Sequence, residues 1–357
     1  MLAEIKEEKM AASSPLSELY LACQRGDSKT VERLIRSIPI NDLNKLESNG
    51  NTCLHTATYH GHEDIVRMLL ENGACRRVIN RCGRTALDKA RTQQVADLFP
   101  RSREEADARF SHSPCQQPEW QFDNGNAEDF SRAFHWNCIK DRGIKKVYKK
   151  LQKSDLFKDY KHDENNLKSI AIVENYFKQA KDENDPIYFL RAYTVESPFY
   201  RHLNREMATG NRREVFEKLC KRWTGYYTGI ILKNVAFDQY RYSGQTFRGM
   251  QITRSDLAQY QKNIVLANKA FQSTSKSWKI AKKFACPSDP IPGKISVMLI
   301  FTILDRRSAL SIETISEYQN EEEVLLVPGT LFIVTNINQT VVPYEIDLLQ
   351  LVWEDEF

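Results

Sequence analysis

Two carboxylates beside an apolar strand are the residues of this sequence best suited to chemistry. Residues 316–327 read S-E-Y-Q-N-E-E-E-V-L-L-V, in which residues 324–327 have the composition of a buried strand. Side chains two apart on an extended backbone share a face, so we expect Glu321 and Glu323 on one face and Glu322 on the other. Two partly desolvated carboxylates raise each other's proton affinity and can stabilise cationic chemistry. The alternative is that the E-E-E run is a solvated acidic surface.

Two further polar features precede these carboxylates. Arg248 lies in the strand-like T-F-R-G, and its charge suits a pyrophosphate. Gly249 follows it, and the missing side chain lets a ligand approach the backbone. Ser273, in the S-T-S of residues 273–275, opens another strand, where a hydroxyl can bridge a ribose and a carboxylate.

The elements that must position these residues are helices followed by strands. Apolar residues at spacings of three and four predict helices over residues 170–180, 188–195 and 197–208. From Thr246 onward, apolar and β-branched runs predict strands, the last within V-V-P-Y-E-I-D-L-L-Q-L-V-W. This order is typical of an α+β domain.

The order of the polar motifs carries a family resemblance. Arg248, Ser273 and Glu321-x-Glu323, with Tyr318 just ahead of the glutamates, are similar to the arginine-serine-glutamate class of mono-ADP-ribosyltransferases. The resemblance covers roughly residues 165–351 and includes S-P-F-Y-R-H-L-N-R-E-M, which looks like the leading helix of that family. It implies a catalytic domain over residues 165–352 with a mixed or antiparallel sheet. The animal ecto-enzymes of this class carry signal peptides and disulfides that are not seen here.

The resemblance also implies a reaction and a role for each residue. ADP-ribose would move from NAD, as co-substrate, to an arginine side chain, with release of nicotinamide. Glu323 would stabilise the oxocarbenium character at the ribose. Arg248 would hold the pyrophosphate or the nicotinamide ribose, and Gly249 would offer its backbone to the nicotinamide amide. Ser273 would position Glu323.

The acceptor side needs its own groups. A guanidinium is fully protonated in water, so we expect Glu321 to orient it and to take its proton, and Tyr318 to shape the acceptor turn. No metal is expected. Two alternatives stay open: NAD glycohydrolysis, in which water replaces the acceptor, and a catalytically silent scaffold. The presence of Arg248, Ser273, Glu321 and Glu323 disfavours the scaffold. Dehydrogenase, phosphoryl-transfer and zinc-peptidase motifs do not occur.

The first hundred residues repeat themselves. L-Y-L-A at Leu19 returns as L-H-T-A at Leu54 and as L-D-K-A at Leu87, a period near 33 residues that indicates stacked helical hairpins. The middle copy, residues 50–74, resembles the ankyrin repeat, while the flanking copies are degenerate and the last is truncated. We expect three repeats over residues 16–100 that form an α-solenoid and bind a target protein.

Three histidines of these repeats could be mistaken for a metal cluster. In an ankyrin repeat the Leu-His position supports the turn by hydrogen bonds. We therefore interpret His55, His60 and His62 as structural.

Residues 101–164 form a looser linker with helices. Its lysines could contact RNA or anionic lipid, but the wet face of an amphipathic helix is the preferred interpretation; they are Lys145, Lys146, Lys149, Lys150 and Lys153. Eight scattered cysteines without a Cys-x-x-Cys pair indicate free thiols rather than a disulfide framework. A zinc site built from His112, Cys115, His135 and Cys138 is a weaker alternative.

Composition and charge limit the partners. The 357 residues are 41% hydrophobic and 27% charged, which is ordinary for globular domains. A net charge of +4 is too mild to predict nucleic-acid binding. The longest apolar run is too short to span a bilayer and no signal peptide is recognised, so we expect a cytoplasmic protein whose partners are NAD and a target protein, not a membrane.

Overall fold

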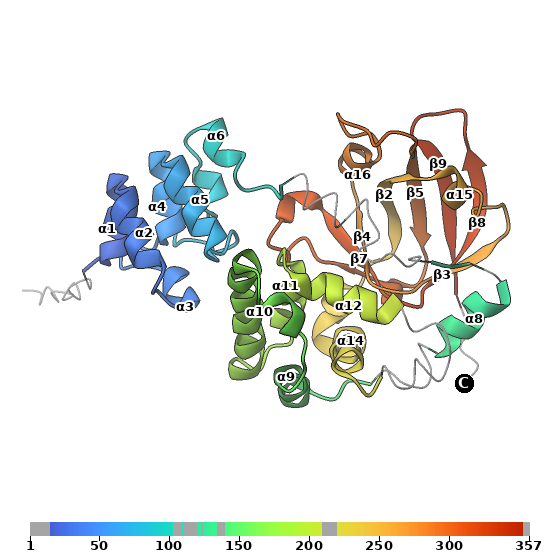
Figure 1. The fold of residues 1–357 in the computed structure, drawn as a ribbon, viewed down its shortest axis with the longest axis horizontal. Coiled ribbons are helices and arrows are strands. Elements are labelled where there is room, and N and C mark those ends of the chain that lie inside the picture. Colours follow the sequence, from blue (N-terminus) through green and yellow to red (C-terminus); the bar gives the residue numbers. More distant parts are fainter. Residues whose placement is uncertain are drawn as a thin grey trace, which may run out of the picture. The chain divides into compact units, whose positions relative to one another are not determined.

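The chain divides into two units, one ending at Pro100 and one beginning at Arg101 (Figure 1). The computed structural model describes residues 15–102, 109, 120–122, 124–133, 140–208 and 220–352. Each unit has its own hydrophobic core. Across these ranges, no helix has both the length and the apolar character needed to cross a bilayer.

The first unit is a stack of short helices. They are α1 (Glu18–Arg25), α2 (Ser28–Ile35), α3 (Ile40–Leu43), α4 (Cys53–His60), α5 (Glu63–Glu71) and α6 (Gln93–Ala96), with a 3-10 turn at Leu87–Lys89. Helices α1 and α2 pack against α4 and α5, and the last copy is reduced to the 3-10 turn and α6. The predicted helical hairpins, including the truncated last copy, are confirmed.

His55 supports a turn of this stack by hydrogen bonds, as predicted. Thr52 caps α4 by accepting a hydrogen bond from the His55 backbone N–H, and the His55 ring bonds the Thr52 backbone N–H in return. The Nε2 atom of His55 lies 3.0 Å from the carbonyl oxygen of Arg84 in the next copy. Burial lowers the pKa of His55, which favours the neutral ring that such bonds require.

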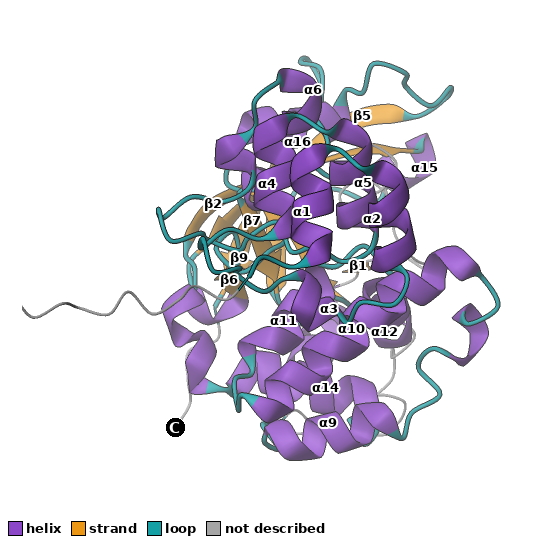
Figure 2. Cartoon of the chain, turned by 90° about the vertical axis from the view of Figure 1, so that its left-hand side faces the viewer, coloured by secondary structure: helices purple, strands orange, loops and turns teal. Residues whose placement is uncertain are grey.

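The second unit is an α+β fold, and most of its helices precede the main run of strands, with α15 and α16 placed between strands. They are α8 (Asn124–Ala133), α9 (Ile144–Gln152), α10 (Glu164–Asp182), α11 (Ile187–Thr194), α12 (Pro198–Ala208), α14 (Trp223–Lys233), α15 (Arg254–Leu257) and α16 (Trp278–Ala285). Helices α9, α10, α11, α12 and α14 gather on one side of the strands in both views (Figures 1 and 2). The three helices predicted from apolar spacing correspond to α10, α11 and α12.

The lysine-rich stretch of the linker forms α9. Val147 and Leu151 are buried on one face of this helix, whereas Lys145, Lys146 and Lys149 are exposed. The amphipathic interpretation is therefore confirmed.

Within the described ranges, nine strands form one mixed sheet in the order β1-β3-β8-β9-β5-β2-β4-β7-β6. Only β5 and β9 pair in parallel among the ladders described. The strands are β1 (Trp120–Phe122), β2 (Gly244–Ile252), β3 (Val265–Asn268), β4 (Gln272–Ser275), β5 (Ile295–Ile303), β6 (Ala309–Ser311), β7 (Glu323–Leu326), β8 (Leu331–Asn338) and β9 (Tyr344–Leu351). The predicted mixed or antiparallel sheet is confirmed.

Alternation along β7 decides which way its acidic residue faces. Val324 and Leu326 belong to the core on one face of the sheet. Leu325 belongs to the other core, together with Phe189 of the helical layer. Because side chains alternate along a strand, Glu323 shares the face of Leu325 and points toward the helices.

Gly249 in β2 lacks a side chain because a helix packs there. A Cβ at this position would lie 1.9 Å from the carbonyl oxygen of Ala281 and 2.6 Å from the backbone nitrogen of Ala285, both in α16. The sequence predicted that a ligand approaches the backbone at Gly249, but on this side of the residue helix α16 occupies that space. The backbone role toward nicotinamide stays a prediction.

We expect Gly249→Ala to destabilise the second unit by about 3 kcal/mol or more, because backbone on both sides must shift. Gly293→Ala is the matched control, since its Cβ meets nothing within 4 Å and only the positive φ of 78° opposes it. Denaturant unfolding of the two variants measures the difference. Equal losses of stability would contradict the packing explanation.

Candidate active site

Adjacent strands β2, β4 and β7 bring the predicted motifs together. Ser275 lies opposite Glu323 in the β4–β7 ladder, and Phe247 lies opposite Ser275 between β2 and β4. The Nη1 atom of Arg248 donates a hydrogen bond to the carbonyl oxygen of Ser273 at 2.8 Å. Arg248, Ser273 and Glu323 are all buried, so one partly desolvated site contains them.

Glu321 reaches this site from a turn. β7 begins at Glu323, whereas Glu321 ends a 3-10 turn over Gln319–Glu321, and Glu322 between them has a left-handed backbone with φ 47°. The hydroxyl of Ser275 donates to the carbonyl oxygen of Glu321 at 2.8 Å and holds the turn. Glu321 and Glu323 are buried and Glu322 is exposed, as predicted, but the expected extended backbone at Glu321 is wrong.

Arg109 covers Glu323. Its Nε donates to Glu323 Oε1 at 3.1 Å, and its Nη1 donates to the carbonyl oxygen of Tyr193 at 3.2 Å. The guanidinium carbon lies 4.7 Å from the centre of the Tyr193 ring and 5.0 Å from that of Tyr200. Both members of this ion pair are buried. Glu323 Oε2 accepts no hydrogen bond from any residue that the structure describes.

Arg101 covers Glu321 in the same manner. Its Nε and Nη2 donate to the two carboxylate oxygens of Glu321 at 3.0 and 3.4 Å, and its Nη1 donates to Glu196 at 2.7 Å. The guanidinium carbon lies 3.9 Å from the centre of the Tyr318 ring. The two residues predicted to contact an acceptor therefore hold a guanidinium of this chain.

Burial and charge act in opposite directions on these groups. Burial is the main reason why the pKa of Glu321 is raised, and Glu323 adds to that rise, while Arg101 opposes it. Burial by itself would lower the pKa of Arg101, but the charge of Glu321, with smaller contributions from Tyr318 and Glu196, raises it. Both guanidiniums are thus charged, and Glu321 binds a proton more tightly than an ordinary glutamate does.

Arg248 and Ser273 line a small cavity beside Arg109. The cavity measures about 10 Å³, which is room for about one water. Its other walls are Tyr193, Tyr200, Asn204, Phe271 and Gln272. Arg248 also donates to the carbonyl oxygen of Arg109 at 3.2 Å, so Arg109 closes the space that these residues would offer a ligand.

The serine role needs adjustment. Ser273 lies opposite Leu325, one pleat away from Glu323, whereas Ser275 lies opposite Glu323 itself. The hydrogen bond that fixes the glutamate turn comes from the Ser275 hydroxyl. The assignment of Ser273 as the residue that positions Glu323 stays a prediction, and Ser275 joins it as a candidate.

Sequence reasoning missed Arg101, Arg109 and Glu196. The two arginines lie 220 and 214 residues from the glutamates that they contact, and no local pattern marks them. Glu196 offered a weak signal, since it directly precedes the S-P-F-Y-R motif of the leading helix.

Within the described ranges, no group of three or more histidine, cysteine or acidic side chains is placed to hold a metal ion. The four residues of the zinc alternative, His112, Cys115, His135 and Cys138, lie outside those ranges. The cysteines that the structure does describe are free thiols.

Comparison with known families agrees with this geometry. Residues 149–352, more than half of the chain, match the profile of the NAD:arginine ADP-ribosyltransferases. The chain belongs to this family. Residues 19–98 match three copies of the ankyrin repeat. The transferase domain is therefore joined to an N-terminal ankyrin unit, as the sequence resemblance predicted.

Individual relatives are distant. The ADP-ribosyltransferase Vis of Vibrio splendidus (strain 12B01) is 32% identical over 100 residues, which is 28% of this chain and 40% of that protein. The crystal structure of Vis with the M6 inhibitor is 21% identical, covers 56% of this chain and 90% of that chain, and has a TM-score of 0.36. The crystal structure of the type III effector XopAI of Xanthomonas axonopodis pv. citri is 17% identical, covers 64% of this chain and 97% of that chain, and has a TM-score of 0.41.

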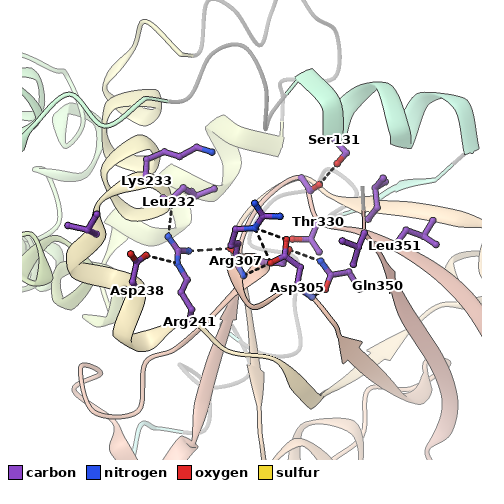
Figure 3. A pocket seen from close by; sticks show the side chains of 15 residues that line it. Ser131, Leu232, Lys233, Asp238, Arg241, Asp305, Arg307, Thr330, Gln350 and Leu351 are labelled. Carbon is purple, nitrogen blue, oxygen red and sulfur yellow. Dashed lines mark hydrogen bonds and ion pairs between the residues drawn. The ribbon is translucent and has the colours of Figure 1, made fainter. Parts of the chain in front are cut away.

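A larger cavity in the transferase unit lies away from these residues (Figure 3). It has a volume of about 320 Å³, and none of the predicted site residues lines it. Its polar groups bond one another: Arg241 donates to the carbonyl oxygens of Leu232 and Arg307, and Gln350 donates to Ser308. The buried carboxylates, not this cavity, are the better candidate for chemistry.

The raised pKa of Glu321 predicts a pH dependence. A group that must be ionised to accept a proton loses function as pH falls through its pKa, so a raised pKa moves that loss to higher pH. We expect transfer to a guanidino acceptor to decline on acidification at a pH above the ordinary glutamate value of 4.5. The pH profile of kcat/KM for the acceptor measures this, and a decline at or below the ordinary value would contradict it.

Proposed function

We propose that this protein transfers ADP-ribose from NAD to arginine side chains of target proteins and releases nicotinamide. One observation carries the proposal: Glu321 binds a guanidinium through two nitrogens while Tyr318 stacks on it. Two parallel N–H···O bonds select an arginine fork over a lysine ammonium. An arginine of a target protein would take this position.

Glu323 supplies the charge that the reaction needs. Cleavage of the nicotinamide–ribose bond leaves the electron pair on nicotinamide and positive charge at the anomeric carbon. A buried carboxylate stabilises that charge more strongly than one in water. The Oε2 atom of Glu323, which bonds to no described residue, suits a ribose hydroxyl.

The remaining residues would bind NAD and complete the transfer. Arg248 would hold the pyrophosphate or the nicotinamide ribose, and the Gly249 backbone would meet the nicotinamide amide. Ser273, with Ser275, would hold the glutamates in place. The guanidino nitrogen then bonds to the anomeric carbon, and Glu321 accepts the proton that this nitrogen gives up.

The ankyrin unit would select the target. Stacked repeats offer an extended protein-binding surface, and Tyr59 and Ile79 of this unit are more than half exposed.

For the catalytic part, the predicted boundary of residues 165–352 omits β1, which pairs with β3, and Arg101. We therefore propose the unit that begins at Arg101 as the fragment to test.

The test incubates the full chain with NAD labelled in the adenosine part and with agmatine, a simple guanidino amine. Labelled agmatine and free nicotinamide are measured separately. We expect both products, in similar amounts. Nicotinamide release without labelled agmatine or labelled protein would favour NAD glycohydrolysis, and no turnover at all would favour the scaffold.

A further inference from the structure

Two arginines of the segment after the repeats occupy both carboxylates of the active site. Arg101 holds Glu321 and Arg109 holds Glu323, and all four side chains are buried. We propose that these linker arginines (Arg101 and Arg109) are internal competitors that keep the site closed: Arg101 against the acceptor arginine and Arg109 against NAD. The proposal rests on the transferase function argued above.

Arg109 blocks the NAD side. Its guanidinium contacts Glu323, the carboxylate that must face the ribose, and its backbone carbonyl takes a hydrogen bond from Arg248. The cavity that remains beside Arg248 and Ser273 holds about one water. A nicotinamide ribose cannot enter while Arg109 stays, so NAD binding requires that Arg109 leave.

Arg101 blocks the acceptor side. It forms the two-nitrogen contact with Glu321 and stacks on Tyr318, which is how an acceptor guanidinium would be held. The third nitrogen of Arg101 donates to Glu196 at 2.7 Å. Because one guanidinium excludes another from the same carboxylate, Arg101 competes directly with a target arginine.

The charges explain why the linker arginines compete with the substrates: both would neutralise the same buried carboxylates. Glu321 and Glu323 bring two negative charges into a buried region, and Arg101 and Arg109 neutralise them, while Glu196 is also paired with the half-exposed Arg201. Uncompensated buried carboxylates are costly. The two cations that the reaction brings, the pyridinium ring of NAD and the acceptor guanidinium, can take over this neutralisation when the linker arginines leave.

Substitution of each arginine tests its competition separately, that of Arg109 with NAD and that of Arg101 with the acceptor. In the full chain, we expect Arg109→Gln to raise kcat/KM for NAD by about tenfold or more, because the fraction of molecules able to bind NAD rises. Arg101→Gln should chiefly lower KM for agmatine. Arg222→Gln is the control, since the Arg222 side chain is more than half exposed and pairs with Glu206 rather than with a carboxylate of the site. Thermal melting verifies that each variant is folded.

A second measurement uses the wild-type chain, so it does not depend on how the variants fold. Hydrogen exchange is followed in peptides that contain Arg101 and Arg109, with and without a non-cleavable NAD analogue plus agmatine. Displacement predicts faster exchange in these peptides when both ligands are bound. Slower exchange, which is the usual effect of a ligand on its site, would overturn the proposal.

The kinetic outcomes also separate this proposal from the function on which it rests. Transfer to agmatine with kcat/KM lowered or unchanged in both variants would mean that the arginines belong to the working site, and internal competition would be wrong. Absence of transfer in the wild type and in every variant would count against the transferase function instead. The exchange experiment still decides in that case whether the arginines are displaced by ligand.

Discussion

Glu323→Gln is expected to lower both ADP-ribose transfer and NAD hydrolysis by about a hundredfold or more. The substitution keeps the shape of the side chain and removes the negative charge that faces the breaking bond. Glu323 is wholly buried, so its charge acts at low dielectric constant and is screened little by solvent. Both reactions pass through the same positive charge at the ribose and should fall together. Nicotinamide release and labelled acceptor, measured at saturating NAD, give the two rates.

Binding of NAD should respond differently to this change. Arg109 loses its counter-ion in Glu323→Gln and holds the closed site less firmly, so NAD affinity should change much less than the rates. Glu322→Gln is the matched control, because Glu322 is the exposed neighbour between the two site glutamates. Near-normal nicotinamide release in folded Glu323→Gln would show that another carboxylate does the chemistry.

Periodicity predicted the parts of the fold that have one buried face. Helices α10, α11 and α12 each bury an apolar side, and their spacing of three and four is visible in the sequence. Helix α14 was not predicted because it is buried on nearly all sides. Nine of its eleven residues are buried, so W-T-G-Y-Y-T-G-I-I-L-K has no polar side that would set a period.

The burial and proximity of three candidate residues were predictable because each lies on or beside an apolar strand. Glu323 adjoins the apolar β7, and Arg248 and Ser273 lie in β2 and β4. The turn at Glu321 was not foreseen, since φ 47° at Glu322 is rare outside glycine and leaves no sequence mark. Arg101 and Arg109 could not be found at all, because they meet the glutamates only through the tertiary fold.

Glu321→Gln is expected to separate the two reactions that Glu323→Gln lowers together. Transfer to arginine should fall by about a hundredfold, whereas hydrolysis of NAD by water should keep most of its rate. A glutamine amide can accept one bond from the guanidinium through its oxygen, but its NH₂ group repels the second N–H, and it cannot take up the proton. Attack by water requires neither the two-nitrogen contact with Glu321 nor a base that removes a proton from a guanidinium.

The structure supports this separation of roles. The backbone of Glu321 is held by the Ser275 hydroxyl through its carbonyl oxygen, a contact that the substitution keeps, so Glu323 should not move. Labelled agmatine and released nicotinamide, compared in wild type, Glu321→Gln and the Glu322→Gln control, give the ratio of transfer to hydrolysis. That ratio should fall steeply in Glu321→Gln alone. An equal loss of both products would mean that Glu321 supports the whole site. The two-nitrogen contact between Glu321 and Arg101 would then be no evidence that the acceptor is an arginine.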